Sequence, residues 1–399
     1  MSVNQSRGPW LTVLLCFGVA VLEGFDIQVL GVAMPRLSPE LGLQPLQKGW
    51  VFAFGNIGLV IGASIGGWLA DRLGRKPVFT TAVLGFALFT LATSLVQTSV
   101  QLCVVRLLAG VGFGAAMPNM MAMAAEISSP GRRSFTTAAM FCGMPLGGGL
   151  SALLTQLLPA GFDWRTLFLI GGVLPLLLVP LLHYFLPETL PVASRQAKRA
   201  PHPPLREVLF GRGRAQPSVL LWFIFLPTLM ALYLILNWLP TLVEAKGFSK
   251  AVAPQASITF NFASVIGALV IGWLVDRCGG RRVLSIAYGC VIVGLFQLGA
   301  ATDLMSVLWL SAAVGFFLMG ANYALYGIAT TYYPTAIRGT GSGVAVGVGR
   351  VGTVLGPLVP GLLLQSGMSA TDIIILMAPT MAVAAIAVYL LGFFPPAKD

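Results

Sequence analysis

Charged residues are scarce in this 399-residue sequence, and their scarcity excludes an ordinary soluble enzyme. Asp, Glu, Lys and Arg make up 9% of the chain, against about 25% in a typical soluble domain. Apolar residues make up 57%, and the mean hydropathy is +0.87. The apolar runs are continuous, whereas a membrane β-barrel needs segments of about ten alternating residues. The composition therefore predicts an all-α polytopic membrane protein.

Cysteine and histidine are also few, with five Cys and two His in the whole chain. The cysteines show no paired spacing, so neither a disulfide framework nor a zinc site is predicted. The sequence contains no nucleophile triad and no Walker-type phosphate loop. We therefore expect no enzyme, no ATP-driven pump, no cofactor and no metal. The net charge of +11 is expected to reside in loops, and not to bind nucleic acid.

Twelve apolar runs are long enough to cross the hydrocarbon core of a bilayer as helices. A polar stretch rich in Pro and Arg, residues 188–216, separates them into two sets of six. We therefore predict two six-helix bundles, 1–187 and 217–399, joined by a cytoplasmic linker. The predicted spans are 10–34, 49–70, 78–97, 100–124, 134–159, 165–186, 217–240, 253–275, 283–301, 305–330, 341–364 and 371–394.

The distribution of Lys and Arg among the loops predicts the orientation. With the amino terminus inside, 17 of the 24 bases fall on the cytoplasmic side, 5 fall outside and 2 lie within spans. Cytoplasmic loops carry such an excess of bases. We therefore expect a multi-pass protein of the cell inner membrane, in contact with the lipid bilayer, with both termini in the cytoplasm. We also expect a monomer.

An internal repeat supports the division into two bundles. Residues 67–74 read GWLADRLG and residues 272–279 read GWLVDRCG, so six of eight positions are identical at an offset of 205. The same offset carries Arg133 onto Arg338. Parallel six-helix repeats are the construction of one large class of secondary transporters.

Three stretches identify this chain as a member of the major facilitator superfamily. They are the loop 67–76, the helix-4 segment from Arg106 to Gly114, and the segment from Tyr333 to Gly341. In the first span, Glu23-Gly24-Phe25-Asp26 resembles the Asp-Gly-x-Asp element of the aromatic acid:proton symporters, with Glu in place of the first Asp. Further stretches are similar to the 3-(3-hydroxyphenyl)propionate transporter branch.

This resemblance implies two pseudo-symmetric six-helix bundles that import a small aromatic carboxylate by proton symport and alternating access. A proton-coupled exporter of amphipathic compounds is the alternative. The histidine that the family often carries after helix 8 is absent here. The functional charges of the family fall on Glu23, Asp26, Asp71, Arg106, Glu126, Asp276, Arg338 and Arg350.

Four charged residues lie deep within the predicted spans: Glu23, Asp26, Arg106 and Arg350. A charge at the bilayer centre costs about 2.5–3.5 kcal/mol on insertion scales. This set, two acids and two bases, predicts a proton-coupling site formed by Glu23, Asp26 and Arg106. Asp26 and Arg106 are both expected about 10 Å below the outer surface, at 1.5 Å per residue. Salt bridges that only fix helix packing are the other interpretation.

Arg350 is predicted to bind the substrate carboxylate, because its planar guanidinium offers two parallel donors. Pairing with the acids of the first span is the alternative. Aromatic and amide side chains suit a hydroxylated ring, although each is as readily explained by packing. These candidate substrate contacts are Phe25, Asn237, Trp238, Asn322, Tyr323 and Tyr326.

A gate is predicted at the cytoplasmic helix ends, where charges of opposite sign adjoin one another. Asp71 and Asp276 occupy equivalent positions of the repeat, beside Arg72 and Arg277. Such pairs are expected to close the cytoplasmic side in one conformation and to part in the other; ordinary solvated loop charges are the alternative. The remaining predicted gate residues are Arg75, Glu126 and Arg338.

Overall fold

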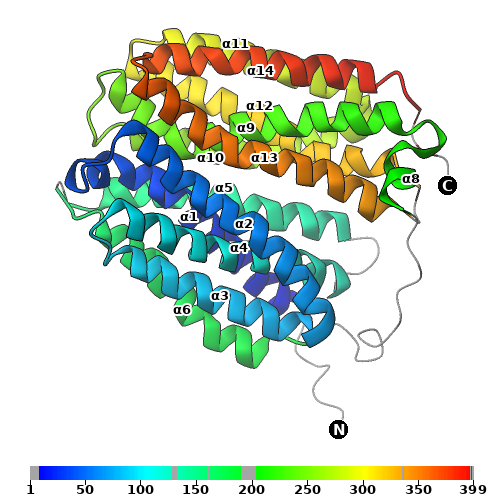
Figure 1. The fold of residues 1–399 in the computed structure, drawn as a ribbon, viewed down its shortest axis with the longest axis horizontal. Helices are drawn as coiled ribbons and strands as arrows, with labels where there is room; N and C mark the ends of the chain where they lie inside the picture. The colour runs from blue at the N-terminus through cyan, green and yellow to red at the C-terminus, as the bar shows by residue number, and fades with distance from the viewer. Residues whose placement is uncertain are drawn as a thin grey trace. The chain divides into compact units, whose positions relative to one another are not determined.

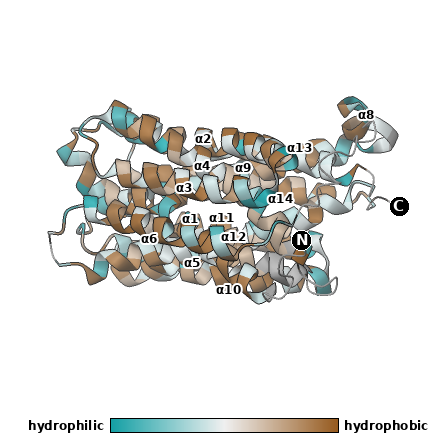
Figure 2. Ribbon diagram, turned by 90° about the horizontal axis from the view of Figure 1, so that it is seen from below, coloured by the Kyte–Doolittle hydropathy of each residue, from teal (hydrophilic) through white to brown (hydrophobic). Residues whose placement is uncertain are grey.

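The computed structural model describes residues 9–127, 133–159, 161–189, 204–334, 337–395 and 397. Throughout these ranges the regular elements are helices, and twelve of them are long and apolar enough to cross a membrane. The spans are predominantly hydrophobic along their length (Figure 2). The expectation of an all-α protein with twelve membrane helices is thus confirmed. Residues 190–203, the centre of the predicted linker, lie outside the described part of the chain.

The helices fall into two compact units, Met1–Lys198 and Arg199–Asp399. A short helix α8 and one turn of 3₁₀ helix, η2, precede the first span of the second unit (Figure 1). The first unit holds α1 (Pro9–Glu40), α2 (Pro45–Leu73), α3 (Arg75–Thr93), α4 (Ser99–Ile127), α5 (Arg133–Leu157) and α6 (Arg165–Phe185). The second holds α8 (Leu205–Phe210), η2 (Gly211–Gly213), α9 (Ala215–Ala245), α10 (Pro254–Cys278), α11 (Gly280–Ala300), α12 (Leu304–Thr331), α13 (Arg338–Gln365) and α14 (Ala370–Leu391).

Three helices end more than three residues from the predicted position, and α2 begins at Pro45 and not at 49. Helix α1 runs to Glu40 and not to 34, and α9 runs to Ala245 and not to 240. The predicted span for α1 stops directly before Pro35 and that for α9 stops at Pro240, but both prolines lie inside their helices. Membrane helices accept proline because neighbouring groups re-satisfy the freed carbonyls. In contrast, α3 ends at Thr93 and not at 97, because Ser94–Val96 form a turn.

The repeat seen in eight residues extends to the whole of both units. Helices α3, α4, α5 and α6 begin at residues 75, 99, 133 and 165, and α11, α12, α13 and α14 begin at residues 280, 304, 338 and 370. Each pair of starting residues differs by 205. The offset found in the short motif therefore also relates whole helices of the two units. The two bundles can therefore be compared position by position.

Helix pairs meet through the same glycines in both bundles. A methyl group on Gly62 of α2 would overlap the carbonyl of Val111 on α4, and a methyl group on Gly267 of α10 would overlap that of Phe316 on α12. Both residues of each contact are related by the offset of 205. Small residues allow such backbone contact between membrane helices. The equivalent contacts of α1 with α5 and of α9 with α13 are Gly147 on Val21 and Gly352 on Leu226.

Candidate functional site

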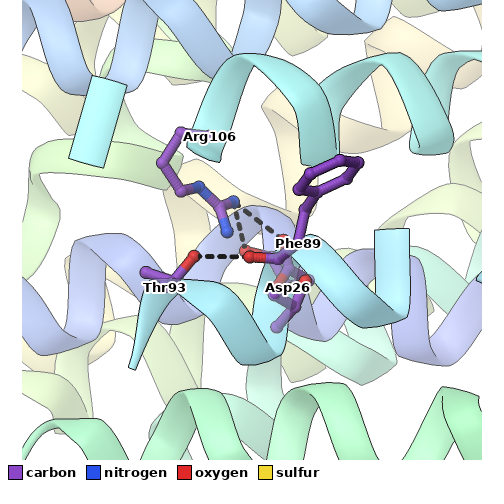
Figure 3. A network of polar contacts seen from close by, with 5 residues as sticks. Asp26, Phe89, Thr93 and Arg106 are labelled. Atoms are coloured by element: carbon purple, nitrogen blue, oxygen red, sulfur yellow. Dashed lines mark hydrogen bonds and ion pairs between the residues drawn. The ribbon is translucent and has the colours of Figure 1, made fainter. Parts of the chain in front are cut away.

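Asp26 and Arg106 form a buried ion pair in the first bundle, between α1 and α4 (Figure 3). Nη2 of Arg106 donates to Oδ2 of Asp26 at 2.8 Å and to its backbone carbonyl oxygen at 3.1 Å. The carboxylate is fully buried and the Arg106 side chain is 5% exposed. Because removal from water is costly for both charges, each stabilises the other by neutralising it.

Asp26 lies farther from the end of its helix than predicted, and the two side chains nonetheless meet. Helix α1 continues to Glu40, so Asp26 lies fourteen residues from the end of its helix, about 21 Å at 1.5 Å per residue. Arg106 lies seven residues from the start of α4, about 10 Å along that helix. Asp26 is therefore near the middle of a helix that extends well beyond the neighbouring end of α4.

Thr90 of α3 completes the site, although no sequence pattern indicated this residue. Its Oγ1 donates to Oδ1 of Asp26 at 2.7 Å, so both carboxylate oxygens accept hydrogen bonds. A threonine in an apolar helix ordinarily bonds a carbonyl of its own helix, as Thr93 does with Phe89 at 3.0 Å (Figure 3). The two threonines differ in what their hydroxyls reach, since that of Thr90 contacts Asp26 on α1.

Arg106 has hydrogen-bonding capacity beyond its contact with Asp26. Its Nε and Nη1 atoms are buried and have no hydrogen-bond partner among the described residues. A guanidinium carries five N–H donors, and only Nη2 is engaged with Asp26. The site thus retains donors suited to a carboxylate or to water.

Glu23 is the second acid of this region and is fully buried. It lies three residues before Asp26 on α1, a spacing that puts both acids on one side of the helix. Gly24, between them, is where α1 touches the backbone of α5, because a methyl group there would overlap the carbonyl of Met144. Close backbone packing holds this segment of α1 in the interior of the bundle.

Three of the candidate substrate contacts are engaged in packing. The ring of Phe25 lies against Gly171 of α6. Trp238 is fully buried and its Nε1 donates to the carbonyl oxygen of Pro357 on α13 at 2.9 Å. Asn237 donates from Nδ2 to the carbonyl oxygen of Tyr233 on its own helix at 2.6 Å. A substrate role for these residues stays a prediction.

The candidates on α12 and α13 differ in exposure. Asn322 is buried, and its Oδ1 has no hydrogen-bond partner among the described residues. Tyr326 is half-buried and packs edge-on against Phe225, with ring centroids 5.5 Å apart. Tyr323 lines a pocket together with Asp276. Arg350 is half-buried near the middle of α13.

Two predicted gate residues of the first bundle, Arg75 and Glu126, form an ion pair at the start of α3. Arg75 pairs with Glu126 at the end of α4, with 2.8 Å between Nη2 and Oε1. The backbone N–H of Arg75, which begins α3, donates to Oε1 of Glu188 at 3.0 Å. A carboxylate at a helix N-terminus is favourable because it satisfies a free N–H and faces the positive end of the helix dipole. Asp71 is half-buried beside this cluster in the sequence.

The same turn occurs in both bundles. Arg72 stacks over the ring of Trp68 at 4.0 Å, and Arg277 stacks over Trp273 at 4.5 Å. The glycine that follows each of these helices has a positive φ, 105° at Gly74 and 85° at Gly279, a conformation that L side chains rarely adopt. The exposed Asp276 lies next to Arg277 at the end of α10.

Arg338, at the start of α13, contacts the loop that precedes it. Its Nε donates to the carbonyl oxygen of Tyr333 at 3.3 Å. The Tyr333 hydroxyl is 2.8 Å from Oγ of Ser218 on α9. Burial raises the pKa of Tyr333, so this phenol remains a neutral hydrogen-bonding group at physiological pH. Ala336 and Thr335, part of the motif that begins at Tyr333, lie outside the described residues.

Within the described residues no group of three or more His, Cys, Asp or Glu side chains is arranged to hold a metal ion. The arrangement consists instead of a buried charge pair in a bundle of apolar helices, with charged turns at the helix ends. Such buried charges in membrane helices mark ion and substrate pathways.

Comparisons with known proteins agree with this architecture. The model of the Major Facilitator Superfamily matches residues 16–325 and 255–399. The chain is 37% identical over 388 residues to the 3-(3-hydroxy-phenyl)propionate transporter of Escherichia coli (strain K12), covering 97% of this chain and 95% of that protein. It is 35% identical to the gallate transporter of Pseudomonas putida, over 95% of this chain and 91% of the relative.

Solved structures show the same fold at low sequence identity. An inward-open structure of the xylose transporter XylE from E. coli has a TM-score of 0.79 at 16% identity, covering 98% of this chain and 97% of that one. A D-xylose-proton symporter has a TM-score of 0.78 at 18% identity, covering 97% and 98%. The chain is therefore a multi-pass membrane transporter and not an enzyme. It belongs to the Major Facilitator Superfamily, where its curated homologues are aromatic acid transporters.

Proposed function

We propose that this protein imports a small aromatic carboxylate together with protons, by alternating access between its two bundles. Glu23, Asp26 and Arg106 couple the protons, and Arg350 binds the carboxylate. The protein resides in the cell inner membrane with both termini in the cytoplasm, and acts as a monomer. The bases concentrated in alternate loops support this orientation.

The observation that carries the proposal is the charge pair of the first bundle, together with its absence from the equivalent place in the second. The offset of 205 carries Asp26 onto Ala231 and Arg106 onto Ser311. The second bundle forms the same helix pairs with these neutral residues. The charged pair is therefore not a requirement of the fold, and its cost in a membrane argues for a role in transport.

Proton coupling follows from the different surroundings of the two acids on α1. Asp26, when ionised, holds Nη2 of Arg106 and the hydroxyl of Thr90. Because Arg106 balances the charge of Asp26, the transported proton binds to Glu23, one turn away on α1. A proton on Glu23 removes a negative charge from this region, which then accepts an anionic substrate more readily. Binding of a substrate anion and uptake of a proton thus favour each other, as symport requires.

An aromatic acid as substrate is supported by the relatives, which are named for 3-(3-hydroxy-phenyl)propionate and for gallate. On this chain, Arg350 supplies the fixed cation. The two tyrosines of α12, Tyr323 and Tyr326, supply aromatic surface, and Asn322 supplies an amide whose Oδ1 is unsatisfied among the described residues. Phe25, Asn237 and Trp238 are further candidate contacts of the substrate.

Proteoliposomes test the whole proposal. The purified protein is reconstituted, and uptake of radiolabelled 3-(3-hydroxyphenyl)propionate is followed with and without an inward proton gradient. We expect accumulation above the external concentration only with the gradient, and its collapse on adding a protonophore. Equal uptake with and without the gradient would reject proton symport, and net efflux coupled to proton entry would identify an exporter instead.

The charge of the substrate should decide binding at Arg350. The methyl ester of a transported acid is expected to compete at least tenfold less well than the acid, because loss of one charge-assisted hydrogen bond costs about 1.5–3 kcal/mol. Arg350→Lys should also be impaired, since an ammonium lacks the planar fork. Competition by acid and ester is measured against labelled substrate; equal potency removes this role from Arg350.

Thr90 is expected to act on transport through Asp26. Thr90→Val has nearly the same shape and removes the hydroxyl that donates to Oδ1, which destabilises the ionised carboxylate by about 1.5–3 kcal/mol. Proton-driven uptake should fall, and the profile of uptake rate against pH should change. Thr90→Ser restores the hydroxyl and should restore the profile. Thr93→Val is the matched control, because the Thr93 hydroxyl donates to the carbonyl oxygen of Phe89 on its own helix. This variant should leave the profile unchanged.

If Asp71 belongs to a gate, its substitution should lower transport activity without lowering expression. Asp71→Asn should reduce the rate of transport severely while the protein still inserts and expresses near normally, because it removes a conformational contact and not a core contact. Uptake rates normalised to the amount of protein in the membrane measure this. A normal rate from correctly inserted Asp71→Asn protein would show that Asp71 is an ordinary surface charge.

A further inference from the structure

A pocket of about 800 Å³ opens at the end of the second bundle where α10 ends and α11 begins. Its lining includes the first residues of α11, Gly280, Arg281 and Arg282, and the end of α12 at Thr331. Asp276 is the acidic residue in the lining. Its volume lies in the range of small-molecule sites and exceeds what a lone inorganic ion needs.

The first bundle fills the equivalent place with its own carboxylates. There, Glu126 pairs with the Arg75 guanidinium and Glu188 accepts from the backbone N–H of Arg75. The offset of 205 carries Arg75, Glu126 and Glu188 onto Gly280, Thr331 and Phe393. The arginine and both acids are thus replaced by uncharged residues in the second bundle, and two of these, Gly280 and Thr331, line the pocket.

The pocket carries two cations of its own, Arg281 and Arg282, which follow the position equivalent to Arg75. Arg282 is exposed to it and makes no ion pair or hydrogen bond with any residue that the structure describes. Arg281 is held by the faces of two rings, 4.2 Å from the centroid of Tyr389 and 3.8 Å from that of Phe393. Stacking uses the face of a guanidinium and leaves the N–H groups at its edge available.

The N-terminus of α11 adds the partial positive charge of a helix dipole to the pocket. Its N-cap residue, Gly279, has no side chain that could bond the free N–H groups of the first turn. In α3, the equivalent helix, Glu188 supplies that bond from outside the helix. Two arginines and an uncapped helix start outweigh the single carboxylate of Asp276, so the local charge favours an anion.

We propose that this pocket binds an exogenous anionic group, a carboxylate or a phosphate, which takes the place that Glu126 and Glu188 occupy in the first bundle. The group is carried either by a free small molecule or by the headgroup of an anionic lipid. Arg282 is its main ionic contact. This site lies wholly within the second bundle and does not rest on the proposed transport function.

Cys278 provides a local reporter of occupancy. It lines the pocket, and it is the exposed member of the five cysteines. The full-length protein is placed in nanodiscs of phosphatidylcholine, and the rate of maleimide labelling at Cys278 is followed by mass spectrometry. Sodium phosphate is compared with sodium chloride at equal ionic strength, and neutral nanodiscs are compared with discs containing phosphatidylglycerol. The thermal unfolding midpoint is measured under the same conditions.

We expect a saturable, several-fold slowing of labelling together with a rise in the unfolding midpoint. A response to phosphate alone identifies a free anion as the ligand, and a response to phosphatidylglycerol alone identifies a lipid headgroup. Arg282→Gln should abolish the response. Thr331→Glu, which restores a carboxylate at the position equivalent to Glu126, should abolish it by filling the pocket from within.

Arg206→Gln is the matched control, because Arg206 is an exposed arginine on α8 outside this pocket. It should respond as the unmodified protein does. The proposal is overturned if neither phosphate nor phosphatidylglycerol changes labelling or the unfolding midpoint of the unmodified protein. It is equally overturned if Arg282→Gln responds as strongly as Arg206→Gln, since the anion would then act elsewhere.

Discussion

Asp26→Asn is expected to abolish proton-driven uptake and to lower the stability of the protein at the same time. The substitution keeps the shape of the side chain but leaves the Arg106 guanidinium, 5% exposed, without its counter-charge. Breaking a buried ion pair by removing one partner costs about 3–5 kcal/mol. That is a large fraction of the total stability of most proteins.

A double variant separates the two consequences. Asp26→Ala combined with Arg106→Ser copies the residues that the second bundle carries at the same positions. Removing both charges should recover most of the stability lost in Asp26→Asn, because no unpaired charge remains. Transport should stay absent, since the coupling site is gone. Unfolding midpoints and uptake of the single and double variants measure the non-additivity.

Asp163→Asn is the matched control for the single variant. Asp163 also lies near an arginine, with 3.6 Å to Arg165, but its side chain is 54% exposed. Exposed pairs contribute about 0–1 kcal/mol, so stability and uptake should both stay near normal. If Asp26→Asn behaves like this control, the buried pair is neither a stability determinant nor a coupling site.

The features of this fold that sequence could predict are those that depend on composition and on repetition. Apolar runs between charged breaks located all twelve helices, and one repeated octapeptide gave the offset that relates them. The ends of α1 and α9 were missed because a proline, Pro35 or Pro240, stops a helix in water but not among packed membrane helices.

Only the charged residues of the candidate site could be predicted from the sequence. Asp26 and Arg106 stand out because a charge within an apolar span is costly. Thr90 was missed because its hydroxyl contact with Asp26 depends on the rotation of α3 within the bundle. The sequence around a single threonine in a helix does not indicate that rotation. The carboxylate cluster around Arg75 likewise joins Glu126 and Glu188, which are distant in sequence.

Glu23→Gln is expected to uncouple transport from the proton gradient while leaving the carrier able to bind and exchange its substrate. Glu23 is fully buried on α1, one turn from an acid whose charge Arg106 already balances. Because Arg106 balances the charge of Asp26, we assign the transported proton to Glu23. Gln has the shape of the protonated acid and cannot release a proton.

The offset of 205 supports the view that a neutral polar group is structurally acceptable here. Glu23 corresponds to Thr228 of α9, which is buried and hydrogen-bonded to the hydroxyl of Tyr288 at 2.7 Å. The unfolding midpoint of Glu23→Gln should therefore stay close to that of the unmodified protein. Glu40→Gln makes the same change on the same helix at a 45% exposed position, and should accumulate substrate normally.

Two assays on the same vesicles separate coupling from binding. Counterflow, in which unlabelled substrate inside exchanges for labelled substrate outside, needs no net proton movement and should survive in Glu23→Gln. Accumulation driven by an imposed pH gradient should fail. The unmodified protein also reports stoichiometry: a monoanion moving with one proton carries no net charge, whereas with two protons a membrane potential adds about 2.3 kcal/mol per 100 mV. If Glu23→Gln still concentrates substrate in response to the pH gradient, the transported proton binds elsewhere, and Asp26 becomes the remaining acid deep in the helices to carry it.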